Sequence, residues 1–474
     1  MLVLTAGLLG IFTFGFFVAD ILLGRKAHIL ERIAVGFLLG SGIFTFVLFL
    51  ANWKLNIPFG LKESLLILLS LNIIAFLLDI FFDRKGKVKK IFDYNFNFKE
   101  GFENSSSFEK IIIGLILFLF FSSLIHNLYW PVSDWDSLAV YDFRAKSFLL
   151  TGYMKDAINS GYFTAYPLYT SLSHTFLYLL GFKNPVFFYS FLYISLIVSL
   201  FFVMHRITHN RTFSLLFALL LSFNPFIYGH SLMSYTNLPY TVMIAVGFAY
   251  ILFSFLNERL DFAAFTLGAV LVSLSSWVRS PEPFWLLAFP FIILFSLYSK
   301  KVFHFIFLSL VVYFPRFIWF EFLKEYKVVA GSYDSGALVG IKGMILNLLS
   351  LNHNKILSYF FENMVFPYSI LLIVFSLSLL FLLYYLTIKK SNLDFKNIKN
   401  IKFVSRLLPS GLVLSMLALM LLGLYLFIFS FGDLAFEIVG SAERSTMPLV
   451  PITLFSIFIN IHFIFNNNHY AKKI

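Results

Sequence analysis

Long apolar runs separated by short polar segments dominate this chain. Each run extends over about 17–25 residues, the length that an α-helix needs to cross the hydrocarbon core of a bilayer. No segment has the strict two-residue alternation of a membrane-barrel strand. We therefore predict an all-α integral membrane protein, a multi-spanning helical bundle with about 13 transmembrane helices, at residues 1–22, 33–51, 63–82, 111–129, 185–204, 212–229, 238–256, 261–279, 284–299, 302–320, 365–388, 408–430 and 446–466.

The composition supports the same class. Of the 474 residues, 59% are hydrophobic and 13% are charged, and the mean hydropathy is +0.86. Cysteine is absent, which excludes a disulfide framework, thiolate chemistry and a zinc–thiolate site. The segment from Met1 to Gly24 has neither a basic start nor a small-residue cleavage signal, so we predict that it is a retained first helix.

The basic residues responsible for the net charge of +12 are unevenly distributed among the loops. Most of the 36 Lys and Arg lie in one of the two alternating sets of loops, including the basic segments 83–110 and 389–407. The positive-inside rule makes that set cytoplasmic, so that the N-terminus is outside and the C-terminus inside. The basic residues then face anionic lipid headgroups, and no nucleic-acid partner is expected.

This topology places the long loops 130–184, 321–364 and 431–445 on the outer side of a plasma (inner) membrane. We divide the chain into N-terminal helices with a basic cytoplasmic loop (1–110), a transmembrane core that carries outer loop 130–184 (111–320), and a C-terminal part with a second long outer loop (321–474). No Gly-rich phosphate loop is visible. An enzyme on the outer face must therefore use an activated substrate that is already in the membrane.

An acidic pair follows the apolar run that ends at Tyr129. Asp134 and Asp136 are two residues apart in the sequence Ser133-Asp134-Trp135-Asp136-Ser137. A charge within the hydrocarbon costs about 2.5–3.5 kcal/mol, so an acidic pair at the membrane rim indicates a functional site.

The residues after this pair predict a helix that lies in the membrane interface. Asp142 and Lys146 are one helical turn apart and are expected to pair, with Arg144 away from the apolar face. We treat the apolar segment 166–182 as a second interfacial or re-entrant element. The predicted apolar face of the first helix consists of Leu138, Tyr141, Ala145, Phe148 and Leu149.

The order of motifs in this loop resembles the first outer loop of GT-C glycosyltransferases. The motifs are Trp135-Asp136, Tyr141, Ala145-Lys146, Gly152, Tyr166-Pro167-Leu168 and Gly181. The resemblance is greatest to bacterial relatives of the protein O-mannosyltransferases and the lipid A aminoarabinose transferases. It covers roughly residues 111–290 and 440–455, the latter through Glu443-Arg444 followed by Pro448 and Pro451. It implies a GT-C-like fold and the inverting transfer of a sugar from a polyprenyl-phosphate carrier.

The resemblance assigns roles that fit the chemistry of glycosyl transfer. The reaction needs a base for the acceptor hydroxyl and cations for the phosphate of the leaving carrier. Asp136 holds the base position. Asp134 is the alternative base, or a ligand that shares with Asp136 a hard divalent cation such as Mg or Mn; no other cofactor is indicated. The candidate phosphate-binding residues are Arg144, Lys146, Arg279 and Arg444. The candidate sugar- or acceptor-binding residues are Trp135, Tyr141, Tyr166, His174, Asn237 and Glu282.

Each of these residues also has a structural explanation. Asp134 or Asp136 can cap the helix that begins near Ser137. Lys146 can serve only to pair with Asp142, and rim arginines can extend to lipid headgroups. The aromatic residues are typical of a membrane-interface belt, and a lone histidine such as His174 is more often structural than a ligand.

Two other functions remain open at this point. A glycan polymerase or ligase would use a lipid-diphosphate-linked oligosaccharide and is expected to have arginine-rich outer loops, which this chain lacks. A lipid or solute transporter is expected to have charges near the middle of its spans and broken helices in repeated halves. We expect a polyprenyl-phosphate-sugar-dependent glycosyltransferase, whose partners are the bilayer, the lipid-linked donor and a glycan, lipid or protein acceptor.

Overall fold

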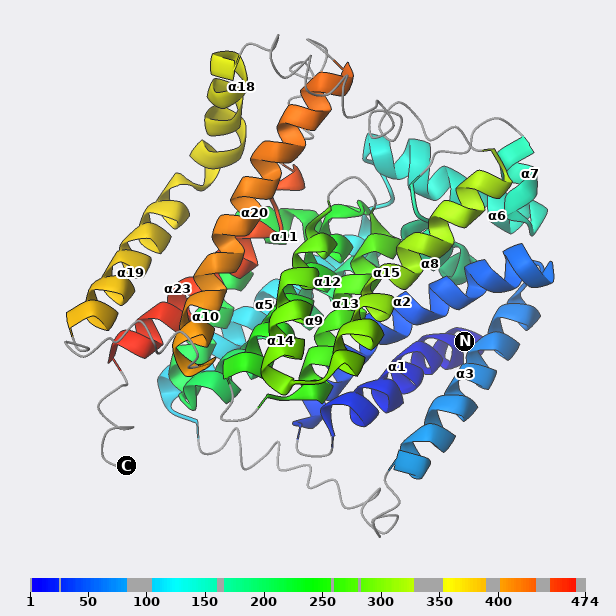
Figure 1. Cartoon of the computed structure of the whole chain (residues 1–474). Helices are drawn as coiled ribbons and strands as arrows, with labels where there is room; N and C mark the ends of the chain where they lie inside the picture. Colours follow the sequence, from blue (N-terminus) through cyan, green and yellow to red (C-terminus); the bar gives the residue numbers. More distant parts are fainter. Residues whose placement is uncertain are drawn as a thin grey trace. The chain divides into compact units, whose positions relative to one another are not determined.

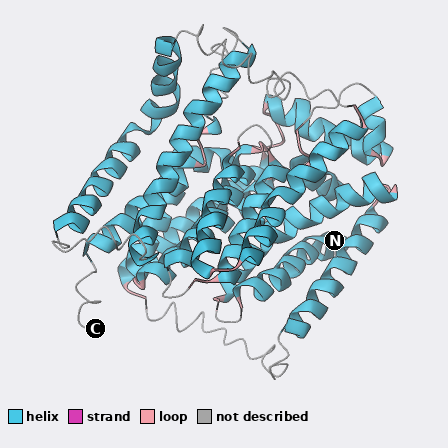
Figure 2. Ribbon diagram, viewed as in Figure 1, coloured by secondary structure: helices cyan, strands magenta, loops and turns pink. Residues whose placement is uncertain are grey.

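A computed structural model describes residues 2–24, 27–82, 105–159, 166–256, 260–279, 283–327, 353–388, 401–431 and 444–465. This part of the chain consists of helices joined by turns and contains no strand (Figure 2). The prediction of an all-α membrane protein is therefore confirmed at the level of fold class.

Nine helices in the described part of the chain are long and apolar enough to cross a membrane, or ten if the bent pair of α10 (Arg211–Ser222) and α11 (Pro225–Ser231) is one span. Every one of the predicted spans coincides with helix, but three of these segments are shorter apolar helices: Phe262–Val278, Phe284–Ser299 and Leu449–Phe465. The predicted number of spans therefore stays a prediction. Hydropathy located these segments correctly, but it does not separate a short apolar helix packed among others from a membrane span.

The chain divides into two compact units, residues 1–163 with 167–243 and residues 164–166 with 244–474. In the first unit (Figure 1), α2 (Ile29–Leu55) packs against α1 (Leu2–Leu23) and α9 (Phe187–Thr208), and α3 (Leu61–Phe82) packs on α1. Helix α9 also contacts α5 (Ser107–Tyr129) and α10 (Arg211–Ser222). The smaller elements of this unit are η2 (Ser137–Asp142), α6 (Phe143–Thr151), α7 (Met154–Asn159), α8 (Tyr169–Leu179) and α11 (Pro225–Ser231).

Helix α12 (Asn237–Leu256) contains the boundary between the units. In the second unit, α15 (Val302–Glu325) packs on α13 (Phe262–Val278) and on α14 (Ala288–Ser299), which follows the short η3 (Phe284–Leu287). Helix α23 (Leu449–Phe465) packs on α19 (Ser369–Ile388) and α20 (Ile401–Phe431). The remaining elements, α18 (His353–Phe360), η5 (Phe361–Val365) and η6 (Phe366–Tyr368), lead into α19.

Polar side chains tie these apolar helices together and define their ends. Helix α5 begins with a capping box, in which Ser106 and Glu109 satisfy each other's backbone N–H groups. Within the second unit, the amide of Asn460 on α23 donates to Ser378 on α19 and to Ser410 on α20, at 3.1 Å in both cases. Side-chain amides and hydroxyls of this kind add direction to helix packing where lipid supplies no hydrophobic driving force.

Glycines allow α1 and α2 to approach closely. A Cβ atom on Gly15 would lie 1.7 Å from the carbonyl oxygen of Gly36, and one on Gly40 would lie 2.3 Å from that of Ile11. Backbone atoms cannot move aside as a flexible side chain can. The helix pair therefore depends on small residues at its contact, as tightly packed membrane helices generally do.

We expect Gly15→Ala to lower the thermal stability of the protein in detergent by roughly 1–3 kcal/mol, because the added methyl group must push α1 away from α2. Gly114→Ala on α5 is the matched control, since a Cβ atom there meets nothing within 4 Å. Thermal unfolding of the two variants beside the wild type measures the effect. Equal midpoints for both variants would show that the two helices do not need this contact.

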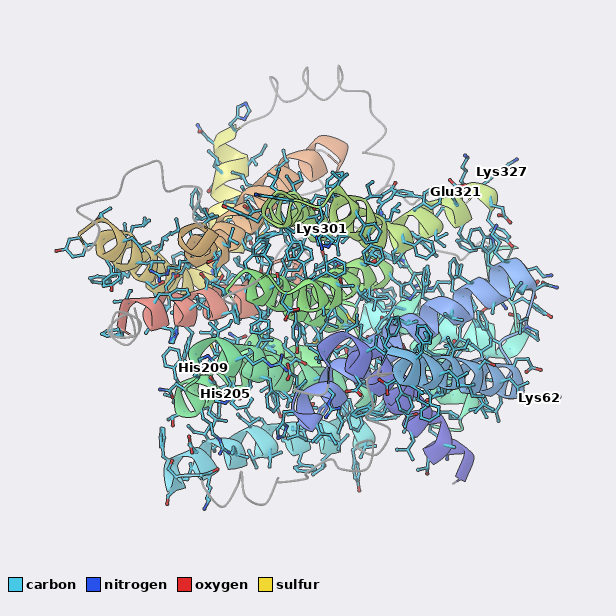
Figure 3. The ribbon with its side chains drawn as sticks, turned by 60° about the horizontal axis from the view of Figure 1, so that its bottom comes forward. Lys62, His205, His209, Lys301, Glu321 and Lys327 are labelled. Atoms are coloured by element: carbon cyan, nitrogen blue, oxygen red, sulfur yellow. The ribbon has the colours of Figure 1, made fainter. Side chains whose placement is uncertain are left out.

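Several charged and titratable groups lie at helix ends. Lys62 is at the start of α3, His205 and His209 are at the end of α9, and Lys301 and Lys327 flank α15 (Figure 3). This distribution is typical of helices whose central turns face hydrocarbon.

Two ion pairs fix the N-terminal end of α2 in the first unit; one is buried on both sides, and in the other only the carboxylate is fully buried. The guanidinium of Arg32 lies 2.5 Å from the carboxylate of Asp20 near the end of α1, and the side chains are 3% and 1% exposed. Glu31, which is fully buried, pairs with Arg206 on α9, also at 2.5 Å. Both pairs place opposite charges in direct contact, as charges removed from water require.

Candidate functional site

The end of α5, which leads into the acidic segment, is held by a buried amide. The side-chain nitrogen of Asn127 donates to the hydroxyl of Ser190 at 2.8 Å and to the carbonyl of Ser231 at 2.7 Å. Asn184 donates in turn to the carbonyls of Asn127 and Trp130, at 2.7 and 2.6 Å. Because Asn184 and Ser190 flank the start of α9, these bonds fasten the end of α5 to α9.

The acidic pair lies at the start of the following helical segment. Asp134 and Asp136 are half-buried, whereas the side chain of Trp135 between them is 79% exposed. The carbonyl of Asp134 accepts the first hydrogen bond of the new helical turn from the backbone N–H of Leu138, at 2.9 Å. The two carboxylates therefore sit on an ordered turn with an exposed aromatic ring between them.

Helix capping does not account for Asp136. Its backbone is already helical, with φ −62° and ψ −33°, and its side chain makes no capping hydrogen bond. A capping residue normally has an extended backbone and accepts from an N–H of the first turn. The structure therefore does not support capping as the explanation for an aspartate at position 136.

Burial raises the pKa of Asp134, and the negative charge of Asp136 raises it further, while a hydrogen bond with its own backbone N–H opposes both. A carboxylate that is partly desolvated and lies beside another negative charge holds its proton more strongly than an isolated one does. Such a shift brings a carboxylate closer to the range in which it can exchange a proton during catalysis.

A six-residue π-helix, η2, begins directly after Asp136. π-Helical turns are rare and occur frequently at functional sites. The wider turn changes which side chains face inward. Tyr141, Ala145 and Phe148 are buried as expected, but Arg144 is also buried, at 1% exposed, with its guanidinium carbon 5.8 Å from the ring centroid of Tyr141. The prediction that Arg144 lies away from the packed face was wrong, because it assumed regular α-helical geometry through the segment.

Protein covers much of the two segments predicted to lie in the membrane interface, and their position relative to the membrane stays a prediction. Helix α8 is buried over residues Tyr169 to Leu177, where it packs against α2 and α6. The inner face of η2–α6 packs on α8 and the adjoining protein, and Leu138 and Leu149 are 43% and 38% exposed. The apolar pattern was correctly recognised, but most of this apolar face is covered by protein.

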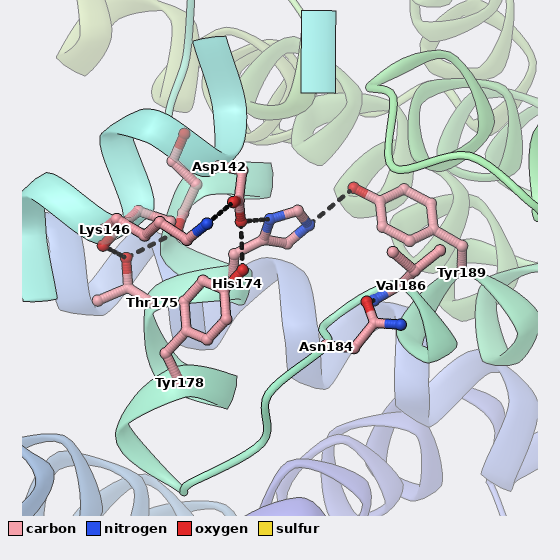
Figure 4. A network of polar contacts seen from close by, with 10 residues as sticks. Asp142, Lys146, His174, Thr175, Tyr178, Asn184, Val186 and Tyr189 are labelled. Atoms are coloured by element: carbon pink, nitrogen blue, oxygen red, sulfur yellow. Dashed lines mark hydrogen bonds and ion pairs between the residues drawn. The ribbon is translucent and has the colours of Figure 1, made fainter. Parts of the chain in front are cut away.

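Asp142 is the centre of a buried polar cluster (Figure 4). Its carboxylate accepts hydrogen bonds from Lys146, at 2.7 Å, and from the hydroxyl of Tyr178. Nδ1 of His174 lies 3.4 Å from the same carboxylate, and Nε2 of His174 lies 3.3 Å from the hydroxyl of Tyr189. The predicted pairing of Asp142 with Lys146 is confirmed.

These partners determine the charge of Asp142. Burial would raise its pKa, but the hydrogen bonds from His174, Lys146 and Tyr178 outweigh this and lower the pKa to about 2. An ionised carboxylate only accepts hydrogen bonds, so Nδ1 of His174 carries the proton that faces it. Nε2 of His174 in turn lies within hydrogen-bonding distance of the hydroxyl of Tyr189, so polar contacts join side chains of η2, α8 and α9.

The other predicted site residues occupy varied positions. In the first unit, His174 is fully buried, Asn237 is 4% exposed at the start of α12, and the hydroxyl of Tyr141 lies 3.0 Å from that of Thr236. In the second unit, Arg279 is the C-cap of α13. Tyr166 and Arg444 also belong to the second unit and are half-buried, whereas Glu282 lies outside the described residues.

Metal binding is not evident in the described residues. They contain no group of three or more His, Asp or Glu side chains that could hold a metal ion. The acidic pair by itself supplies two carboxylates, whereas a hard divalent cation usually takes six or more oxygen ligands.

Two members of the Asp142 cluster were missed from the sequence. Tyr178 lies one helical turn after His174, so the spacing of the two residues on α8 was an available signal. Tyr189 offered no such signal, because it belongs to another helix and meets His174 only through tertiary packing.

Comparison with known proteins identifies no family for this chain: no protein-family model, no curated protein and no solved structure matches it.

Proposed function

We propose that this protein is a GT-C-like glycosyltransferase. It moves a sugar from a polyprenyl-phosphate carrier to an acceptor hydroxyl, with inversion at the anomeric carbon. The observation that supports this most strongly is the half-buried Asp134/Asp136 pair at the end of a candidate span, followed at once by a π-helix. The motif order from Trp135 to Gly181 supports the same class.

The proposed topology places this pair on the outer face of the plasma membrane. The bent pair α10–α11 counts as one span, and α13, η3–α14 and α23 also cross, which gives 13 spans with the N-terminus outside. The basic loops are then cytoplasmic, in agreement with the positive-inside rule. Nucleotide sugars are on the opposite side, so the donor is a lipid-linked sugar.

In the proposed reaction, Asp136 takes the proton of the acceptor hydroxyl as its oxygen bonds to the anomeric carbon. The bond from that carbon to the phosphate oxygen breaks, and the phosphate leaves on its lipid carrier. Cations stabilise the charge that develops there. Lys146, with 57% of its side chain exposed, is better placed for this than the buried Arg144, although its ammonium also pairs with Asp142. Arg279 and Arg444, the other two candidate phosphate-binding residues from the sequence, belong to the second unit.

Incubation with labelled donors tests this function. Purified protein in lipid vesicles receives radiolabelled polyprenyl-phosphate sugars, one at a time, together with an extract of acceptor lipids, glycans and proteins. We expect label to leave one monophosphate-linked carrier. Label loss only from diphosphate-linked oligosaccharides would favour a polymerase or ligase. Movement of an intact donor across the vesicle membrane would favour a transporter, and either result would contradict the proposal.

A further inference from the structure

The acidic segment is fastened at both ends to two adjacent residues of α9. Upstream, Asn127 at the end of α5 bonds to Ser190. Downstream, Asp142 at the end of η2 connects through His174 to Tyr189. The residues between these two points include Asp134, Asp136 and almost all of the π-helix. One turn of α9 therefore carries both anchors of the segment that we propose as the active-site loop.

The downstream anchor has features that simple packing would not need. Asp142 and His174 are 1% and 0% exposed, so neither can contact a substrate in this arrangement. Desolvating a carboxylate is costly, and a well-packed apolar pair commonly stabilises a fold as well or better. A charged group with directional bonds instead fixes one geometry, because each acceptor has a defined donor.

The π-helix connects this anchor to the catalytic candidate. Asp136 immediately precedes η2, and Asp142 is its last residue. A shift of Asp142 along α8 is therefore transmitted to Asp136 through the six residues of η2. Misplacing a catalytic group by about 1 Å can reduce the rate about 100-fold.

We propose that Asp142 and His174 are positioning residues, which hold the carboxylate of Asp136 in register with α9. This inference rests on the proposed transferase function for its effect on rate, but the clamp itself can be measured without any activity. In this proposal His174 acts on Asp136 through Asp142 and η2, and it does not bind the acceptor.

The absence of cysteine makes a direct distance measurement feasible. Ser133→Cys in the acidic segment and Lys183→Cys before α9 replace two exposed residues of the same unit and accept spin labels. We expect a narrow distance distribution in this background. His174→Phe, which removes both ring nitrogens, is expected to broaden or shift it, and the milder Tyr189→Phe is expected to do so less.

Ser41→Ala is the matched control. The Ser41 hydroxyl lies 3.1 Å from that of Tyr169, so this variant also removes a buried hydrogen bond between α8 and a neighbouring helix, but outside the clamp. We expect its distance distribution and its kcat to match those of the wild type. Unfolding midpoints measured on all variants identify any that fail to fold. If His174→Phe is one of them, Tyr189→Phe replaces it in the comparison with the wild type.

Kinetics complete the test. We expect His174→Phe to lower kcat about 10–100-fold while KM for the donor changes less than about 3-fold, and His174→Asn, which can still donate to Asp142, to recover part of the loss. An unchanged distance distribution in His174→Phe would overturn the clamp. A broadened distribution with unchanged kcat would overturn its role in positioning Asp136. A broadened distribution in a protein that consumes no donor would support the clamp and remove the proposed function.

Discussion

Asp136→Asn is expected to lower the rate of sugar transfer by about 10²–10⁴-fold, the contribution that a general base typically makes. Asparagine has nearly the same shape as aspartate but cannot take the proton of the acceptor hydroxyl. Asp136 is half-buried and has a helical backbone, which asparagine adopts as readily as aspartate. Initial rates of label loss from the donor, beside the affinity for the donor, measure the effect.

Asp156→Asn on α7 is the control for this substitution, because it neutralises another half-buried carboxylate of the same unit. Its rate should equal that of the wild type. Full activity in Asp136→Asn together with a loss in Asp134→Asn would transfer the role of base to Asp134.

The pH dependence separates the two carboxylates further. Burial and the charge of Asp136 raise the pKa of Asp134, so Asp134 becomes protonated at a higher pH than an ordinary aspartate does. If its charge is needed, activity falls on acidification at a pH above the usual carboxylate range. Removal of the neighbouring charge in Asp136→Asn lowers the pKa of Asp134 and moves any residual acid limb to lower pH.

The largest expected effect on stability comes from the buried pair of Asp20 and Arg32. Removal of one partner leaves the other charge buried, which typically costs about 3–5 kcal/mol. We expect Asp20→Asn to be strongly harmful, because the guanidinium of Arg32 that it leaves behind cannot lose its charge. Unfolding of the purified variants in micelles by added denaturing detergent measures the effect.

The double variant Asp20→Asn/Arg32→Met removes both charges and should recover much of the lost stability. Lys62→Ala, which removes an exposed charge at the start of α3, is the control and should change stability by less than about 1 kcal/mol. Equal unfolding midpoints for Asp20→Asn and Lys62→Ala would show that the pair does not stabilise the contact between α1 and α2.

The sequence pattern predicted those features that depend on residues close together along the chain. The apolar runs located the helices, since a segment that must satisfy its own backbone in lipid has few alternatives to a helix. The position of the acidic pair after Tyr129 and the pairing of Asp142 with Lys146 also followed from spacing along the chain.

Features that depend on tertiary packing were not predictable in this way. The π-helix after Asp136 adds a residue to one turn, and no local propensity indicates where that happens. Its consequence, the burial of Arg144, was missed for that reason. The contacts of Asp142 with His174 and of His174 with Tyr189 join three separate elements. The sequence therefore offered His174 only as a candidate sugar- or acceptor-binding residue and gave no sign that it is fully buried.

The configuration of the product tests the central claim most directly. Purified protein is supplied with the polyprenyl-phosphate sugar that it consumes, and the anomeric configuration of the transferred sugar is determined by NMR. A single displacement with Asp136 as base predicts inversion relative to the donor. Retention would indicate two successive displacements through a covalent sugar–enzyme intermediate, with a carboxylate as nucleophile. Retention, or the absence of transfer from any monophosphate-linked sugar, would contradict the account.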